Sequence, residues 1–185
     1  PGLGLAVNLS PRQFRQPDLV KVVAEILEES RLPPASLKLE ITESSLMNNV
    51  SDVISTLQQL VALGVHLSID DFGTGYSSLA YLKDFPVHTL KIDRSFVRDL
   101  GHDTRCEGIV RTIVALAKTL GLSALAEGVE TPYQRDQLAE MGCEFFQGFF
   151  FHRPMSLAQL STVLAGERPK GSGSTRRARL EQSAM

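Results

Sequence analysis

The chain has 185 residues, of which 43% are hydrophobic and 22% charged, and its formal net charge is −2. This composition is typical of a globular protein and excludes a wholly disordered chain, and the near balance of charge argues against a dedicated DNA-binding surface. No apolar run approaches the ~20 residues that span a bilayer, and no signal peptide is evident. The two cysteines are too few for a disulfide scaffold, so we expect reduced thiols in the cytoplasm.

Charge and composition divide the chain into two parts. Residues 166–185 carry five basic and two acidic residues, include Gly171-Ser172-Gly173-Ser174, and contain few large apolar side chains. We interpret residues 1–165 as one domain and residues 166–185 as a disordered basic tail. A nucleic-acid-binding arm is the alternative reading of this tail.

The first half of the chain alternates strand-like apolar runs with amphipathic helices. Residues 4–9 form the first run, and a helix that begins near Pro17 places apolar residues at helical spacing (Leu19, Val22, Val23, Ile26 and Leu27) until Pro33-Pro34 stops it. Residues 37–41 form the second strand. A helix over residues 50–61 ends at Gly64, and residues 65–69 form the third strand.

The second half repeats the pattern. A short helix over residues 79–83 precedes a strand at 89–92, and a long helix with its apolar stripe between Ile109 and Leu120 precedes a strand at 123–126. Thr131-Pro132 begins a further helix that ends at Gly142. Residues 145–148 form the sixth strand, and Ser156 caps a last helix.

Six strand–helix units predict an α/β fold with parallel strands and helical crossovers. The units fit either an open doubly wound sheet or part of a TIM-like (β/α)₈ barrel. Because complete barrels usually need about 250 residues, a barrel built from this chain would lack two strands.

Polar residues gather where these strands end. They are Asn8, Glu40, Glu43, Asp70, Asp71, Lys91, Asp93, Glu127, Glu130 and Gln147. In parallel α/β folds the carboxyl ends of the strands form one face, so these side chains should converge. Convergent carboxylates force protonation or recruit cations, and an oxygen-rich set favours Mg²⁺ or Mn²⁺. Two such ions with a nearby lysine indicate metal-assisted phosphoester hydrolysis.

Each signal also has an ordinary structural reading. Glu40 alternates with apolar neighbours and could face solvent. Asp70-Asp71 could simply begin a loop, and Glu127 and Glu130 could be acidic residues in the first turn of a helix. Only their shared position at one end of the strands favours a site.

The ordered motifs resemble those of bacterial EAL-domain cyclic-di-GMP phosphodiesterases, from about Leu3 to Leu164. They read Asn8-Leu9-Ser10, Leu39-Glu40-Ile41-Thr42-Glu43-Ser44, Asp70-Asp71-Phe72-Gly73-Thr74-Gly75-Tyr76-Ser77-Ser78, Lys91-Ile92-Asp93, Ala126-Glu127-Gly128-Val129-Glu130 and Phe146-Gln147-Gly148. The resemblance implies a TIM-like barrel that cleaves cyclic di-GMP to linear pGpG with two Mg²⁺ or Mn²⁺.

The resemblance also implies residue roles. Asn8, Glu40 and Asp70 would hold the first metal, and Asp70 and Asp71 the second. Glu127 would lie near the second metal and its water, Lys91 would orient or deprotonate that water, and Gln147 would bind water or metal. Glu130 and Asp93 would contact substrate or support the site. Glu43 would anchor the loop 72–78 with Gly73, Thr74 and Gly75, and this loop and the helix after Lys91 would form a homodimer contact.

One departure from the family is large. The Glu-Ala-Leu tripeptide that names it, whose Glu is a metal ligand, occurs nowhere in this chain. The chain opens at Pro1 without an initiator Met, so we expect a truncation that removes the first two strands and leaves weak or absent turnover. A sensory or GGDEF domain would precede it in the parent protein. The alternatives are a non-catalytic cyclic-di-GMP-binding or protein-interaction module, and another metal-dependent phosphoesterase.

Overall fold

The computed structural model describes residues 3–47, 50–75 and 79–166. The chain divides into two compact units, Pro1–His152 and Arg153–Met185. The first unit holds every strand and all but one of the described helices. The second contributes helix α9 (Leu157–Leu164). Ser156 caps this helix, as predicted, and Gln159 completes a capping box that was not predicted.

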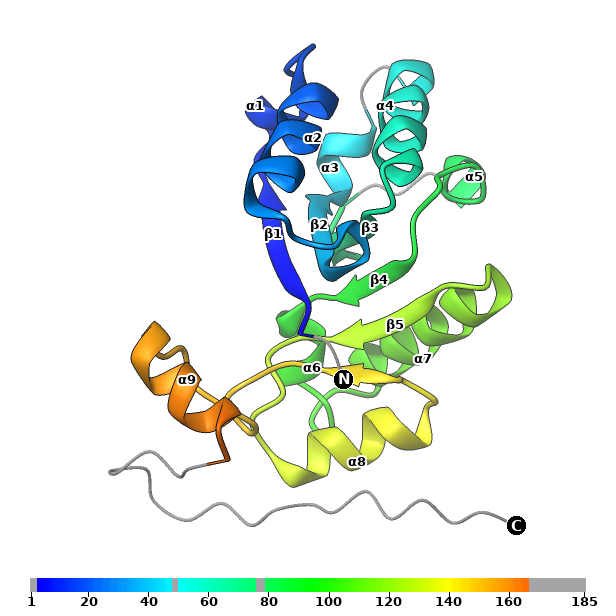
Figure 1. Cartoon of the computed structure of the whole chain (residues 1–185). Coiled ribbons are helices and arrows are strands. Elements are labelled where there is room, and N and C mark those ends of the chain that lie inside the picture. The colour runs from blue at the N-terminus through cyan, green and yellow to red at the C-terminus, as the bar shows by residue number, and fades with distance from the viewer. Residues whose placement is uncertain (1–2, 48–49, 76–78, 167–185) are drawn as a thin grey trace, which may run out of the picture. The chain divides into compact units, whose positions relative to one another are not determined.

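The first unit is built on one six-stranded parallel sheet (Figure 1). Its strands are adjacent in sequence order, from β1 at one edge to β6 at the other. They are β1 (Leu5–Leu9), β2 (Leu37–Thr42), β3 (His66–Phe72), β4 (Thr89–Ile92), β5 (Ser123–Ala126) and β6 (Phe145–Phe146). The sequential order excludes the open doubly wound alternative, in which the strand order reverses.

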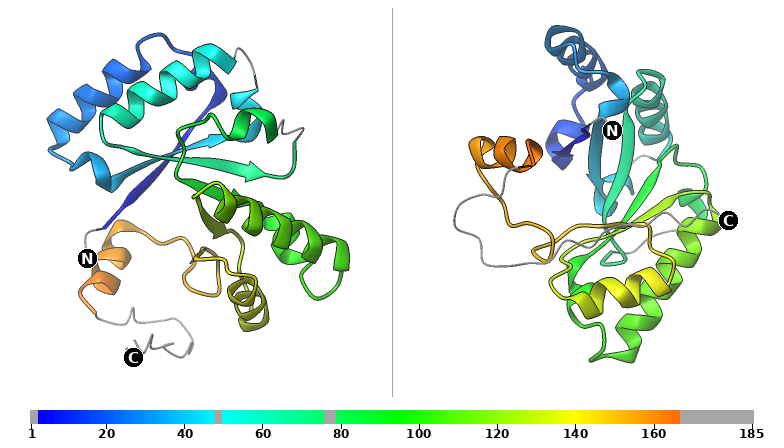
Figure 2. Two further views of the ribbon diagram at one scale, coloured as in Figure 1. Left: turned by 90° about the vertical axis from the view of Figure 1, so that its right-hand side faces the viewer. Right: turned by 60° about the horizontal axis from the view of Figure 1, so that its bottom comes forward.

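Helical segments connect these strands. They are α1 (Pro11–Phe14), α2 (Leu19–Ser30), the 3-10 turn η1 (Pro34–Ser36), α3 (Glu43–Leu46), α4 (Val50–Ala62), α5 (Leu79–Leu82), α6 (Arg94–Arg98), α7 (Thr104–Thr119) and α8 (Pro132–Glu140). Helices α2 and α4 lie side by side, and α7 packs on β4 and β5 (Figure 2).

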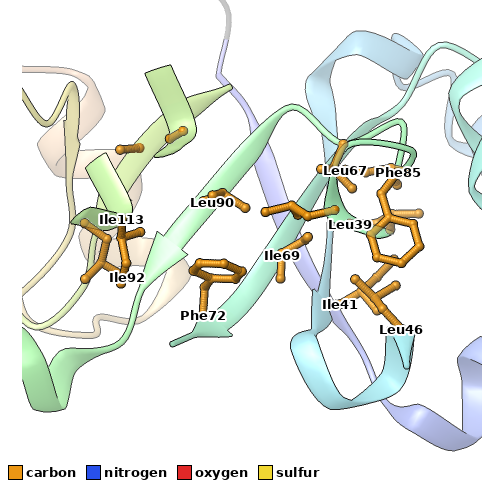
Figure 3. Packing of buried hydrophobic residues seen from close by; sticks show 14 of the residues in the cluster. Leu39, Ile41, Leu46, Leu67, Ile69, Phe72, Phe85, Leu90, Ile92 and Ile113 are labelled. Atoms are coloured by element: carbon orange, nitrogen blue, oxygen red, sulfur yellow. The ribbon is translucent and has the colours of Figure 1, made fainter. Parts of the chain in front are cut away.

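The core lies between the sheet and these helices. Strand residues such as Ile41, Leu67 and Leu90 are completely buried and belong to one hydrophobic cluster (Figure 3). Helix α4 contributes Leu57 to the core and α7 contributes Val110. Because successive strand residues point to opposite faces of the sheet, the residues between these buried ones lie on the face away from the helices, where polar side chains can gather.

The sheet curls on itself. The Lys38 ammonium on β2 lies 5.8 Å from the ring centroid of Phe145 on β6, although three strands separate these two in the sheet. Strand β1 is an open edge on which Leu5 and Val7 are exposed. A curled sheet of six parallel strands with helical crossovers is an incomplete barrel, as the sequence predicted.

Most predicted elements are confirmed, with differences at short ones. Strand β3 extends to Phe72, so that Asp70 and Asp71 belong to the strand, and β6 has two residues in place of four. The short helices α1, α3 and α6 were not predicted from periodicity, because four or five residues show no helical period. Only the family resemblance implied a helix after Lys91, where α6 lies. On α2, Val22 and Ile26 are exposed, so its buried stripe is narrower than predicted.

Two further predictions concern other parts of the chain. The proposed tail from residue 167 onward lies outside the described residues, as do Tyr76, Ser77 and Ser78. Among the described helices, none has the length and apolar character needed to cross a membrane.

Candidate active site

Lys91 is the centre of the polar cluster at the carboxyl ends of the strands. It lies on β4 and is only 2% exposed. Its ammonium lies 2.6 Å from Glu40 Oε2, 2.7 Å from Glu127 Oε1 and 2.9 Å from Asp70 Oδ1. Burial opposes the charge, but hydrogen bonds to the three carboxylates raise the pKa of Lys91 above its usual value. The ammonium is therefore held charged and partly neutralises an acidic pocket.

Four strands supply this cluster because parallel strands end at one edge. Glu40 comes from β2, Asp70 from β3 and Lys91 from β4, and Glu127 directly follows β5. Burial raises the pKa of Glu127, against the lowering effect of Lys91. Asn8 on β1 is in register with Glu40 on β2, which places this exposed amide at the border of the cluster.

A backbone irregularity in β3 brings two consecutive carboxylates together. Adjacent strand residues normally point to opposite faces. The register between β3 and β4 shifts between Ile69 and Phe72, and Asp71 has a φ of 53°, in the left-handed region. As a result, carboxylate oxygens of Asp70, Asp71 and Glu127 lie within 4.8 Å of one another. Such strain in a non-glycine residue is typical of functional sites.

Asp71 also interacts with Asp93, the residue that caps α6. Burial and the neighbouring charges of Asp70 and Asp93 raise the pKa of Asp71. Asp93 is itself partly buried, but hydrogen bonds from the Ser95 amide and hydroxyl lower its pKa. Each of these two carboxyls contributes to the pKa shift of the other, so the negative charge is favoured on Asp93 over Asp71.

Glu43, at the start of α3, anchors the loop after β3. It is 3% exposed, and its Oε2 accepts a hydrogen bond of 2.9 Å from the Gly73 amide. A Cβ at Gly75 would lie 2.6 Å from Glu43 Oε1, so only glycine fits beside this carboxylate. The Thr74 hydroxyl bonds the Asp71 carbonyl at 2.8 Å. These contacts connect the loop directly to the strained aspartate.

A cavity of about 230 Å³ adjoins the cluster on the β6 side. Its lining comes from the starts of the segments that follow β4, β5 and β6: Arg94, Glu127, Gly128, Glu130, Gln147, Gly148 and Phe149. Two backbone hydrogen bonds join its walls, from Gln147 to the Ala126 carbonyl and from Val129 to the Gln147 carbonyl. Gln147 and Glu130, predicted as site residues, are thus in one cavity with Glu127.

The geometry decides among the alternative readings. Glu40 is buried and paired with Lys91, so its solvent-facing interpretation is wrong. Asp70-Asp71 belongs to β3, and α8 begins only at Pro132, so Glu127 and Glu130 are not acids of its first turn. Sequence reasoning missed Arg94, which lines the cavity. Its position directly after Lys91-Ile92-Asp93, at the end of a strand, was the available signal.

The donor set fits a divalent cation. Three carboxylates have oxygens within 4.8 Å of one another, and Glu40 joins them through Lys91. All ligand atoms are oxygens, the preference of hard cations such as Mg²⁺ and Mn²⁺. The raised pKa values of Asp71 and Glu127 reflect repulsion and burial that a bound cation would relieve.

The fold and the acidic cluster define the chain as a barrel-type α/β domain with a candidate metal-dependent site. The family model described as EAL domain matches residues 1–154, and the chain belongs to this family. Its resemblance to EAL-domain proteins, expected from the motifs, is thereby confirmed.

One relative is the bifunctional diguanylate cyclase/cyclic di-GMP phosphodiesterase MucR of Pseudomonas aeruginosa, to which the chain is 49% identical over 161 residues. The alignment covers 87% of this chain and 24% of MucR. A solved structure of the MucR phosphodiesterase in complex with c-di-GMP has a TM-score of 0.83 at 50% identity, covering 85% of this chain and 64% of the other. The EAL domain of Mycobacterium smegmatis DcpA has a TM-score of 0.85 at 44% identity, covering 90% of this chain and 74% of the other.

A third relative was solved with metal. The manganese/cy-diGMP complex of Klebsiella pneumoniae BlrP1 has a TM-score of 0.72 at 35% identity, covering 79% of this chain and 38% of the other. The chain spans 20 to 24% of the length of the first curated relatives that it matches.

Proposed function

We propose that this chain takes part in metal-dependent hydrolysis of cyclic di-GMP to linear pGpG. One observation carries the proposal: a buried ammonium, Lys91, faces Glu40, Asp70 and Glu127, while Asp71 lies beside the last two. One cation does not balance four carboxylates, so the pocket attracts further positive charge. Relatives that act on or bind cyclic di-GMP, such as MucR and BlrP1, support this substrate.

The cations would be two Mg²⁺ or Mn²⁺ ions. Their ligands would come from the cluster described above: Asn8, Glu40, Asp70, Asp71, Glu127 and Gln147. Bound there, the ions would polarise the phosphodiester and lower the pKa of an attacking water. The manganese complex of BlrP1 supports this choice of metal.

Lys91 would hold the attacking water by donating a hydrogen bond. Its raised pKa makes it a donor in the metal-free protein, because three carboxylates stabilise the ammonium. Proton acceptance by Lys91 would require cations to take over these carboxylates first. Glu43 would act through the loop: its bond to Gly73 holds the backbone around Asp71 in the strained conformation.

The loop after β3 and helix α6 would also provide the homodimer contact that the family resemblance implies. A Cβ at Gly73 would lie 3.1 Å from the Phe96 ring on α6 and from Ile113 on α7. Gly73, at the start of this loop, therefore packs directly against α6 and α7, and the dimer surface would be built around this contact. A sensory or GGDEF domain in the parent protein would then reach the catalytic loop through this surface.

A second reading is a module that binds cyclic di-GMP without cleaving it. The absence of any Glu-Ala-Leu tripeptide in the 185 residues favours it, because the family takes a metal ligand from that motif. We therefore expect slow turnover by this chain compared with a family domain that carries the tripeptide.

The test is turnover of cyclic di-GMP by the purified chain with Mn²⁺, followed as linear pGpG by chromatography. The inactive control is the double variant Asp70→Asn/Asp71→Asn. The matched surface control is Asp136→Asn on α8, an exposed carboxylate that pairs with Arg135 and belongs neither to the carboxylate cluster nor to the cavity lining. We expect slow product formation that the double variant abolishes and Asp136→Asn leaves unchanged.

Two other results would change the reading. Binding of cyclic di-GMP without product would support the non-catalytic module. Product that persists in the double variant would contradict a site built on Asp70 and Asp71.

A further inference from the structure

We infer that residues 153–185 are a docking surface for an anionic lipid bilayer, in which helix α9 supplies the apolar contact and the basic residues after it supply the charge. These residues make up the second compact unit of the chain, whereas every candidate site residue belongs to the first. Binding to a bilayer is therefore a property separate from the proposed catalytic function, and it is tested without turnover.

Helix α9, drawn in orange in Figure 1, leaves its apolar side chains in solvent. None of its eight residues is buried, and Leu157, Leu160 and Leu164 are 78%, 40% and 51% exposed. Spacings of three and four residues place these leucines on one face of the helix, while Gln159 and Thr162 lie on the other. The helix contains no charged residue. It is thus amphipathic, with an exposed leucine face.

The sequence that follows α9 is basic. Residues 166–185 have five basic and two acidic residues, a net charge of +3, although the whole chain has a net charge of −2. The basic residues are Arg168, Lys170, Arg176, Arg177 and Arg179. Residues 1–165 are therefore acidic overall, and the excess of positive charge is confined to the segment after the leucine face.

The two features together are what an anionic bilayer surface requires. An amphipathic helix lies in the interface with its apolar face among the acyl chains, and each nearby Lys or Arg strengthens attachment to anionic headgroups by about fivefold. Three leucines on a two-turn helix bind weakly by themselves, so the charge is needed as a second signal. Because no described helix is long and apolar enough to cross a membrane, the contact would be confined to the surface.

The leucine face separates a bilayer from two other occupants. A nucleic acid would engage the basic residues through its phosphates but would leave the leucines uncovered. Residues 153–185 also contain no Phe, Tyr or Trp on which bases could stack. A second copy of the chain would cover the leucines, but it would bring two segments of net charge +3 together. Only the lipid surface uses both features.

The test is sedimentation of the full chain with vesicles of equal parts phosphatidylglycerol and phosphatidylcholine, compared with vesicles of phosphatidylcholine alone. At about 0.1 M salt we expect binding to the anionic vesicles and at least about tenfold weaker binding to the neutral ones. At about 1 M salt, where surface charges are screened, binding to the anionic vesicles should weaken.

The apolar contribution is tested by Leu157→Ser/Leu160→Ser. We expect this variant to bind anionic vesicles at least about tenfold more weakly, because two leucines no longer leave water. The matched control is Ala158→Ser/Thr162→Ser, which introduces two serines on the other face of the same helix and should bind as wild type does. Circular dichroism checks that the variants keep the helical content of wild type.

The charge contribution is tested by Arg176→Gln/Arg177→Gln/Arg179→Gln, for which we expect about a hundredfold loss of binding to anionic vesicles. The matched control removes three exposed charges from α7 in the first unit, with Arg105→Gln/Arg111→Gln/Lys118→Gln. The control changes the net charge of the chain equally and should retain most of the binding.

Binding that needs anionic lipid, the leucine face and the C-terminal arginines supports the surface. Equal losses in the two arginine variants, or undiminished binding by the leucine variant, would overturn it in favour of general charge attraction. Failure of wild type to bind anionic vesicles would also overturn it. If wild type then retains poly(U) RNA, the basic residues serve a nucleic acid, and a dimer in sedimentation equilibrium that the leucine variant dissociates would assign α9 to a second copy.

Discussion

The two ends of the same six strands carry polar residues of very different kinds. At the carboxyl ends, Lys91 is buried against Glu40, Asp70 and Glu127, and carboxylates outnumber cations. At the amino ends, His66 and His88 find their partners locally. His88 Nδ1 accepts a 3.1 Å hydrogen bond from the Leu67 amide, and His66 packs edge-on against the His88 ring at 4.8 Å.

This contrast separates a binding site from ordinary polar structure. Both ends place titratable groups next to one another, so proximity alone does not distinguish them. What distinguishes the carboxyl end is an uncompensated charge in a buried place, together with backbone strain at Asp71. Groups that protein contacts leave unbalanced are the ones that a ligand completes.

The largest expected effect on stability is that of replacing Lys91 at the carboxyl ends of the strands, compared with replacing Lys38 at the amino ends. Lys91→Met leaves three buried carboxylates without their cation, and we expect it to lower the free energy of unfolding by about 3–5 kcal/mol. Lys38→Met at the amino end loses a contact to the Phe145 ring and should cost about 1 kcal/mol or less. Urea unfolding in EDTA measures both. Equal losses would remove the distinction between the two ends.

The next effect concerns the loop anchor. In Gly75→Ala the new Cβ would meet the buried Glu43 carboxylate, so we expect a loss of about 2 kcal/mol and a weaker response to Mn²⁺. The control is Gly108→Ala on α7, where nothing lies within 4 Å, and which should gain about 0.5–1 kcal/mol. Thermal unfolding with and without Mn²⁺ checks both variants. A Gly75→Ala protein as stable as wild type would show that the loop does not depend on Glu43.

A smaller effect tests the strained aspartate. Asp71 and Arg31 are the non-glycine residues with positive φ in the described part of the chain. Both Asp71→Gly and Arg31→Gly should gain about 1 kcal/mol in EDTA, because glycine adopts this conformation freely. Only Asp71→Gly should lose stabilisation by Mn²⁺. An unaltered Mn²⁺ response in Asp71→Gly would place the metal elsewhere.

The smallest effect is at the amino end and depends on pH. Burial and the neighbouring His66 lower the pKa of His88, so its folded state favours the neutral ring. The folded pKa lies below the unfolded value of about 6.5, so this contribution is complete above pH 6.5 and is lost as pH falls through the folded pKa. Urea midpoints between pH 5 and 8 should fall less steeply on acidification in His88→Gln than in wild type. A parallel decline in both proteins would assign the pH dependence to other groups.

Much of this arrangement could be predicted from the sequence, because parallel strands bring their carboxyl ends to one edge. Strands β4 and β5 begin and end at the predicted residues. The periodicity of the sequence does not reveal that the sheet curls. The alternation of residues around Glu40 is equally compatible with a side chain that faces solvent, whereas in the curled sheet the Lys91 ammonium lies 2.6 Å from Glu40 Oε2. The irregularity in β3 that brings Asp71 close to Asp70 is likewise local, so no periodic pattern in the sequence predicts it.

Arg94 escaped prediction for a related reason. Its exposure is ordinary for an arginine, and its helix α6 has only five residues. Its place in the cavity depends on Gly128 and Gly148 in two later segments. A Cβ at Gly148 would lie 2.2 Å from the Val129 carbonyl oxygen, so these segments approach each other as only glycine allows. Such contacts between distant segments are not visible in a single local motif.

The central claim is that the carboxylates at the carboxyl ends bind divalent cations. Titration of the chain with Mn²⁺, followed by electron paramagnetic resonance of the free ion, measures this binding without turnover. We predict that wild type and Asp136→Asn deplete the free Mn²⁺ signal and that Asp70→Asn/Asp71→Asn does not. Depletion of the signal by the double variant to the wild-type extent, or none by wild type, would contradict the account.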